Sequence, residues 1–154
     1  MKQNKTKHLA INGVVAAVYA VLTLINPLSF GAIQFRVSTL ILPLAVFVPQ
    51  ISPGLVVGTA VGNLNSSLGM IDIVVGSIVS FIAVFIVPKA RIKPLMAVLY
   101  AVESGILVSL ELFYCFKTPI LYSIVTVGVS GLILYSLGIV IMKQISKPLV
   151  KYFV

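Results

Sequence analysis

The sequence is poor in charged residues and contains almost no acidic ones. Charged residues make up 9% of its 154 positions, and only three of them are Asp or Glu. The chain has one cysteine and one histidine, which excludes an internal disulfide and leaves too few groups for a metal centre or a Ser-His-Asp arrangement. It also lacks the G-x-x-x-x-G-K-[ST] loop that binds nucleotide phosphates. We therefore expect no enzyme, metal or cofactor here, and any ATP hydrolysis must belong to separate ATPase subunits.

Hydrophobic residues dominate what is present. They account for 60% of the chain, and the mean hydropathy is +1.18. Such a chain has too little polar surface to cover a soluble globule. Several apolar runs are long enough for helices and lack the alternation of a barrel strand. The sequence predicts an all-α integral membrane protein with a single domain over residues 1–154.

The net charge of +8 is distributed as in a membrane protein rather than a nucleic-acid-binding one. Nine of the eleven basic residues fall into three clusters at the ends of apolar runs. Basic residues flanking membrane spans favour the cytoplasmic side, so we place all three clusters, and both termini, in the cytoplasm. The clusters are Lys2, Lys5 and Lys7; Lys89, Arg91 and Lys93; and Lys143, Lys147 and Lys151.

Proline, glycine and polar turns divide the apolar sequence into six predicted spans. An even number of crossings must separate the first two basic clusters, and four fit the turns best. The second and third spans are short for the ~20 residues of a full crossing, so one of them could instead be re-entrant. The six predicted helices cover about residues 9–25, 37–48, 53–64, 70–87, 94–114 and 118–142.

This topology brings the polar side chains of the membrane body to the outer face. Arg36 is the only charged residue between His8 and Asp72, and a charge so close to a membrane core needs a partner, a wet cavity or the interface. Polar groups gathered at one mouth of an apolar bundle are the default site for a ligand. They are Gln34, Arg36, Asn63, Asn65, Ser66, Ser67, Asp72, Glu111 and Lys117.

The fifth predicted helix carries a polar stripe. Tyr100, Ser104, Glu111 and Tyr114 share one face, with Glu103 at its margin. Carboxylates and phenols inside a span should point into the bundle, because lipid leaves them unpaired. The two glutamates lie about 12 Å apart along the axis, too far for one shared proton.

Each charged candidate also has a purely structural interpretation. Glu111 could pair only with Lys117 near the interface, and Asp72 could only cap the start of the fourth helix. Arg36 could only anchor the second helix at the level of the lipid headgroups.

Small residues form a seam along the first predicted helix. Ala10, Gly13, Ala16, Ala17 and Ala20 recur at steps of three and four, and such seams let a second helix approach closely. The second helix would belong either to a partner subunit or to the chain itself.

Several blocks resemble one family of transporters. Residues 29–38 read S-F-G-A-I-Q-F-R-V-S, and the pattern over residues 62–76 places Asn63, Asp72 and Gly76 at matching positions. L-E-L at residues 110–112 precedes an aromatic loop and a proline. These blocks resemble the QueT-type queuosine-precursor transporters, which are substrate-binding S components of energy-coupling factor (ECF) transporters.

The resemblance implies a six-helix S component in the plasma membrane of a prokaryote, embedded in the lipid bilayer and without a nucleic-acid partner. It implies docking of the small-residue seam on a transmembrane scaffold (T) subunit, which two cytoplasmic ATPase subunits drive. The substrate would be a small molecule, a 7-deazaguanine-like base captured from outside.

The resemblance and the chemistry of that base together nominate the binding residues. A carboxylate accepts the adjacent N–H donors of a guanine-like edge, and an acid or an aromatic face suits an aminomethyl cation. Arg36 would hold the loop that precedes it closed. Phe30 and Phe35 could stack on the base, but they are also typical of aromatic residues at the membrane interface. The predicted substrate-binding residues are Phe30, Gln34, Phe35, Arg36, Asn63, Asp72, Glu103, Glu111 and Tyr114.

The chain departs from the family pattern at three places. Thr39, Ser104 and the Ser130-Gly131 pair stand where acidic residues and an asparagine are expected, and Glu103 would compensate. These departures keep open an S component for another vitamin or nucleobase-like compound. A standalone secondary carrier is a further alternative, although the chain shows no inverted internal repeat.

Overall fold

The computed structural model describes the chain over residues 2–30 and 34–151. All regular structure in these ranges is helical. Four helical segments are long and apolar enough to cross a membrane. One of them begins three residues inside α1, and another continues past the end of α4. The predicted all-α membrane class is thereby confirmed. The α-helices are α1 (Lys2–Ile25), α2 (Leu44–Phe47), α3 (Ser52–Gly62), α4 (Met70–Phe81), α5 (Lys93–Phe116) and α6 (Ile120–Val150).

The helix boundaries differ from the predicted ones mainly in the first, second and last regions, and the first helix begins at Lys2 rather than at about residue 9. The predicted helix over about 37–48 is two short pieces, a 3₁₀ turn at Val37–Ile41 and α2, separated by Pro43. Proline lacks the N–H that would continue the helix. The last helix runs to Val150 rather than to about 142, because the lysines of the third basic cluster are good helix formers.

The four long segments are Lys5–Ile25, Met70–Ala90, Lys93–Phe116 and Ile120–Val150. The second of these segments contains α4 and the π and 3₁₀ turns that follow it, and Pro88 lies in the last of these turns. The apolar stretch Val37–Phe47 and the 11-residue α3 are shorter than the ~20 residues of a full crossing. The number of crossings, six in the prediction, is therefore not settled by helix length.

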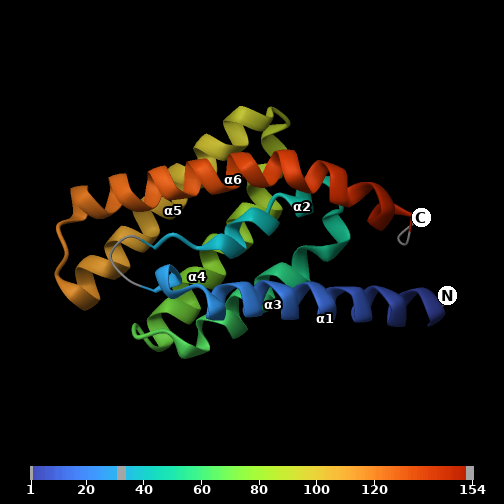
Figure 1. The fold of residues 1–154 in the computed structure, drawn as a ribbon, viewed down its shortest axis with the longest axis horizontal. Helices are drawn as coiled ribbons and strands as arrows, with labels where there is room; N and C mark the ends of the chain where they lie inside the picture. The colour runs from blue at the N-terminus through green and yellow to red at the C-terminus, as the bar shows by residue number, and fades with distance from the viewer. Residues whose placement is uncertain (1, 31–33, 152–154) are drawn as a thin grey trace.

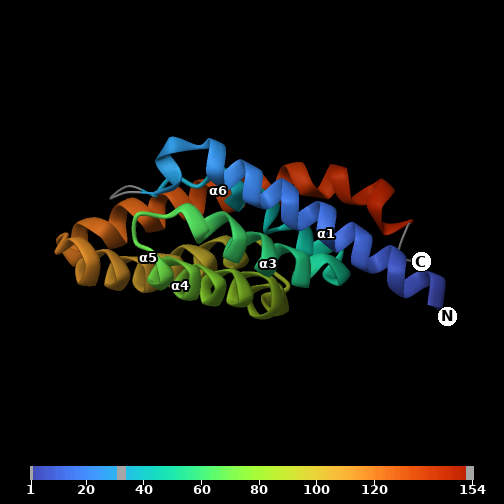
Figure 2. The ribbon, with the colours of Figure 1, turned by 90° about the horizontal axis from the view of Figure 1, so that it is seen from below.

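The polar turns lie at one end of the bundle and the two chain ends lie at the other (Figures 1 and 2). The turn between α3 and α4, the described residues after α1, and the turn between α5 and α6 all lie towards this polar end, and the α5–α6 turn lies furthest out. Two helix pairs make the most extensive contacts, α5 with α6 and α1 with α3. Tyr135, Leu42 and Leu112 are fully buried in the core.

The outer faces of the long helices are apolar. Val14 on α1, Ile78 on α4, Val102 on α5 and Val129 on α6 are each about half exposed or more. Such faces can lie directly against lipid chains, because the backbone polar groups of a helix are already hydrogen-bonded within the helix.

Three glycines of α3 allow it to touch α1. Gly54, Gly58 and Gly62 recur every four residues and are buried. A Cβ added at Gly58 would lie 2.8 Å from the carbonyl oxygen of Ala16, so only glycine fits. The backbone N–H of Gly54 donates a 2.7 Å hydrogen bond to Asn12 Oδ1. This contact holds α1 against the bundle without a hydrophobic driving force.

The sequence left open whether the small-residue seam of α1 packs against this chain or against a partner subunit. The structure assigns two of its residues to packing within the chain. Ala16 packs on Gly58, and Ala20 is buried, so these two serve internal packing. Ala10, Gly13 and Ala17 are exposed. A partner-docking face on α1 therefore stays a prediction for the exposed three.

We expect the Gly58→Ala substitution to lower the free energy of unfolding by about 1–3 kcal/mol, because the added methyl group meets backbone atoms of α1. Gly13→Ala in α1 is the matched control, since a Cβ at Gly13 meets nothing within 4 Å. It should leave stability unchanged or raise it slightly through helix propensity. Thermal unfolding of both purified variants in detergent measures the difference, and equal stabilities would contradict the proposed close contact.

Candidate functional site

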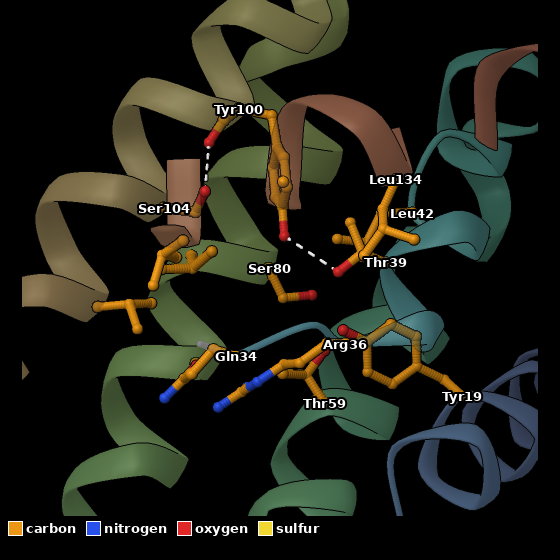
Figure 3. Close-up of a pocket in the computed structure, with 15 residues that line it drawn as sticks. Tyr19, Gln34, Arg36, Thr39, Leu42, Thr59, Ser80, Tyr100, Ser104 and Leu134 are labelled. Atoms are coloured by element: carbon orange, nitrogen blue, oxygen red, sulfur yellow. Dashed lines mark hydrogen bonds between the residues drawn. The ribbon is translucent and has the colours of Figure 1, made fainter. Parts of the chain in front are cut away.

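A small polar cavity lies at the centre of the bundle, and every long helix contributes to its wall (Figure 3). We call it the polar cavity. Its volume is about 30 Å³, far below the ~300–1,000 Å³ of typical ligand pockets. It is lined by Tyr19, Gln34, Arg36, Thr39, Leu42, Thr59, Gly76, Val79, Ser80, Tyr100, Ser104, Val108, Val127, Gly131 and Leu134.

A network of bonds around Arg36 closes one end of the polar cavity. Its Nη2 donates to Asp72 Oδ1 at 2.7 Å, and its Nη1 donates to Asn63 Oδ1 at 3.2 Å. Its Nε donates to the carbonyl oxygen of Ser29 at 3.0 Å. The side chains of Arg36 and Asp72 are 11% and 0% exposed, so this is a buried ion pair. We call Ser29, Arg36, Asn63 and Asp72 the arginine cluster.

The arginine cluster rules out two structural interpretations that the sequence left open. Asp72 lies in the first turn of α4, but the N-cap, Gly69, has no side-chain cap bond, and Asp72 Oδ1 is bonded to Arg36 and Asn63 instead. Arg36 is buried in the protein rather than placed among lipid headgroups. Gly76 makes room for the cluster, because a Cβ there would overlap the amide of Asn63.

Side chains from the end of α1 hold the chain that carries Arg36. Asn26 Nδ2 donates to the carbonyl oxygen of Phe35 at 2.6 Å, and Asn26 Oδ1 accepts from the N–H of Leu28 at 3.1 Å. Deeper in the bundle, the hydroxyls of Thr23 and Ser38 lie 2.8 Å apart. These bonds place the backbone on either side of Arg36 against α1.

Gln34 lies beside Arg36 at the same end of the polar cavity (Figure 3). Its φ of 46° lies in the left-handed region, which is uncommon for residues other than glycine. Its Nε2 is buried and has no hydrogen-bond partner among the described residues. Backbone strain and an unsatisfied amide often mark positions that a protein keeps for a ligand.

Tyr100 and Ser104 of α5 lie at the opposite end of the polar cavity (Figure 3). The hydroxyls of Tyr100 and Thr39 are 3.3 Å apart, and Ser104 donates to the carbonyl oxygen of Tyr100 at 2.7 Å. The Tyr100 ring stacks on Tyr135 with centroids 4.7 Å apart. The predicted inward orientation of this part of the α5 stripe is confirmed.

Glu111 and Glu103 lie near the polar cavity without lining it. Glu111 is 4% exposed, and the carboxylate oxygens of both residues are buried without a hydrogen-bond partner in the described part of the chain. No ion pair joins Glu111 to Lys117 within that part. The Lys117 ammonium instead lies 5.6 Å from the ring of Phe113 and 5.8 Å from that of Tyr114.

Glu111 lies near the end of α5 (Lys93–Phe116), and this end of the helix is at the polar end of the bundle. Glu103 lies deeper, eight residues or about 12 Å back along α5.

The predicted aromatic residues are less closely involved. The ring of Phe30 lies 5.9 Å from the Arg36 guanidinium, and Phe35 is half-buried. Tyr114 is 70% exposed, so the prediction that it shares the buried face of α5 is wrong. The turn between α5 and α6, which follows Tyr114 in the chain, projects beyond the rest of the bundle (Figure 1).

Four polar residues that line the polar cavity were not among the predicted binding residues. Tyr19 belongs to a recurring inner face of α1 with Ala16 and Thr23, a pattern visible in the sequence beside the small-residue seam. The others carried no periodic signal that separates them from ordinary helix-packing hydroxyls. The four are Tyr19, Thr39, Thr59 and Ser80.

The positions at which the sequence departs from the family pattern meet in the same place. Thr39, Ser104 and Gly131 all line the polar cavity. The hydroxyl of Ser104 would lie 3.1 Å from a Cβ added at Gly131. A change of side chain at any of these positions alters the shape of the cavity directly.

The fold and the site together define an all-helical, multi-pass membrane protein that encloses a polar cavity. The family model described as QueT transporter matches residues 9–147, and the chain therefore belongs to the QueT transporter family. It is 26% identical to the queuosine precursor transporter QueT of Lactococcus lactis subsp. cremoris over 165 aligned residues, which cover 96% of each chain. No solved structure shows a significant match.

We expect Arg36→Gln and Asp72→Asn each to lower the free energy of unfolding by about 3–5 kcal/mol, because either change leaves one buried charge without its partner. The double variant should lose less than the sum of the two. Denaturation of the four proteins in detergent completes the cycle, with Lys89→Gln as a control for loss of an exposed cation. Additive effects of the two substitutions would show that the pair is not coupled.

Proposed function

We propose that the chain is the substrate-binding subunit of an ATP-driven importer of the ECF type, and that it captures a queuosine precursor, a 7-deazaguanine-like base. The observation that carries the proposal is the polar cavity, closed by the arginine cluster and surrounded by polar atoms without partners. Membership of the QueT transporter family and the name of the Lactococcus relative support it.

The unpartnered groups suit the edge of a guanine-like base. The carboxylate of Glu111 and Asp72 Oδ2 lack hydrogen-bond donors in the described residues, and Gln34 Nε2 lacks an acceptor. A guanine-like edge offers adjacent N–H donors and a carbonyl acceptor, and charged hydrogen bonds to it are the strong ones. Burying such groups unpaired is costly, so a ligand that pairs them gains affinity.

The polar cavity must enlarge to hold a base. At about 30 Å³ it has room for a few water molecules at most, since roughly 10–15 Å³ of such space holds one. Arg36 lies between the cavity and Asp72, so substrate binding in this proposal proceeds by opening the bond between them. In this proposal Glu111, whose buried carboxylate has no hydrogen-bond partner in the described residues, then accepts hydrogen bonds from the base.

The proposal includes six crossings with both termini in the cytoplasm of a prokaryotic cell. The three basic clusters would then face the cytoplasm, and the polar end of the bundle would face outward. The energising partners would be a scaffold (T) subunit and two ATPase subunits. The exposed residues Ala10, Gly13 and Ala17 of α1 are the proposed docking face for the scaffold.

A second candidate substrate is a different nucleobase-like compound or vitamin, bound by the same subunit. It is favoured by the location of Thr39, Ser104 and Gly131 in the wall of the polar cavity. Side chains that differ from the family pattern at these positions would change which ring substituents fit.

We expect the purified chain to bind a 7-aminomethyl-7-deazaguanine base, and Glu111→Gln to weaken binding about 10- to 100-fold, the loss for one charged hydrogen bond. Titration calorimetry measures both. Lys117→Gln, which also removes one charge near the end of α5, should bind as the unmodified chain does. Unchanged affinity in Glu111→Gln would remove Glu111 from the site, and binding of another base in preference would select the second candidate.

The coupling to ATP hydrolysis is tested separately in cells. We expect uptake of the base to vanish when the ATPase subunits are absent, while the isolated chain still binds it. Uptake that persists without them would identify a standalone carrier instead.

The proposed topology predicts labelling of single cysteines from outside the cell. In a Cys115→Ser background, Asn65→Cys should react with a membrane-impermeant maleimide, and Lys89→Cys should react only after the membrane is permeabilised. Both positions are exposed, so burial does not bias the comparison. The reverse pattern would invert the crossings and place the polar end inside.

A further inference from the structure

A second hollow lies well away from the arginine cluster, between the start of α5 and the last part of α6. Its volume is about 700 Å³, within the ~300–1,000 Å³ range of ligand pockets. None of its residues lines the polar cavity. We call it the lysine cleft; its walls are Lys93, Ile139, Val140, Lys143, Gln144 and Lys147.

The sequence brings its three lysines together from two helices. Lys143 and Lys147 are four residues apart, so they are neighbours on one face of α6. Lys93 is the first residue of α5, and its ammonium lies 5.7 Å from the ring of Phe47 on α2. Because α2 packs against α6, this contact holds Lys93 towards the other two lysines.

No carboxylate side chain of the protein is placed to neutralise the lysine cleft. The sequence has only three, and Asp72 is paired with Arg36 at the polar end. Glu103 lies ten residues beyond Lys93 on α5, about 15 Å along the axis, and Glu111 is about 27 Å away. The like charges of the cleft therefore repel one another, and an anion from outside the protein would relieve that repulsion.

The floor of the cleft is apolar and continues onto the surface that faces lipid. Ile139 is buried beneath the lysines, while Val140 is 64% exposed. Leu137 and Ile141 extend the exposed apolar surface along α6. An occupant that matches both parts needs an anionic head and a hydrocarbon chain, and basic pockets between membrane helices bind such headgroups.

We infer that the lysine cleft is a binding site for an anionic phospholipid, with the phosphate between the three lysines and an acyl chain along Val140. A free phosphate would use the lysines but not the apolar wall. An acidic protein segment would match the charge but not the hydrocarbon surface beside it. The site is independent of the substrate proposed for the polar cavity.

The test compares lipid binding by two variants that lose the same charge. The cleft variant carries Lys93→Gln, Lys143→Gln and Lys147→Gln, and the control carries Lys89→Gln, Arg91→Gln and Lys117→Gln, all at exposed positions outside the cleft. Native mass spectrometry of each protein, released from nanodiscs of phosphatidylglycerol and phosphatidylcholine, measures the retained phosphatidylglycerol. Thermal unfolding checks that both variants fold.

We expect the cleft variant to bind phosphatidylglycerol about a hundredfold more weakly, roughly fivefold for each lysine removed, and the control to stay within about twofold of the unmodified chain. Equal retention by the cleft variant and the control would overturn the inference. Displacement of the lipid by millimolar inorganic phosphate would identify a small-anion site instead. Unchanged lipid retention with loss of co-purifying energising subunits would identify a protein contact, which also overturns it.

Discussion

The buried ion pair between Arg36 and Asp72 is the interaction on which the polar end of this protein depends. Taking two charges out of water costs several kcal/mol for each ion, and the cost is recovered only if the geometry is good and other lone pairs and protons are satisfied. Asn63 and the carbonyl of Ser29 satisfy the remaining groups in part, while Asp72 Oδ2 has no donor among the described residues. The pair therefore joins the chain before α2, the end of α3 and the start of α4 at a single point. Everything proposed about substrate capture follows from opening or closing this point.

Close backbone contacts make the rest of the arrangement possible. Gly58 brings α3 onto α1, and Gly138 brings α6 to the backbone of Leu40. Gly76 performs the same role at the arginine cluster, where any side chain would displace Asn63. In a membrane, where lipid is as apolar as the helix surface, such contacts replace the hydrophobic effect as the reason for association. They also explain why the polar cavity is small.

Much of this could be predicted from the residues alone, and the failures have identifiable causes. The gathering of Arg36, Asn63 and Asp72 at one end followed from the placement of basic clusters and turns. Tyr114 was assigned to the wrong environment because helical periodicity describes a face but not where the neighbouring helices end. The second predicted helix was interrupted because Pro43 outweighed the hydrophobic run around it.

By itself, the sequence determined the all-helical membrane class and the family, because composition and motif order are properties of the chain and need no coordinates. It also showed which few polar and charged residues lie within the apolar part of the chain, and these residues became the candidates for the binding site. Only the tertiary structure decided which of them touch: that Arg36 binds Asp72 rather than a headgroup, that Thr39 meets Tyr100, and that Lys93 lies beside α6. These are contacts between residues far apart in sequence. They depend on how closely the helices approach, which is set by three-dimensional packing that no local pattern encodes.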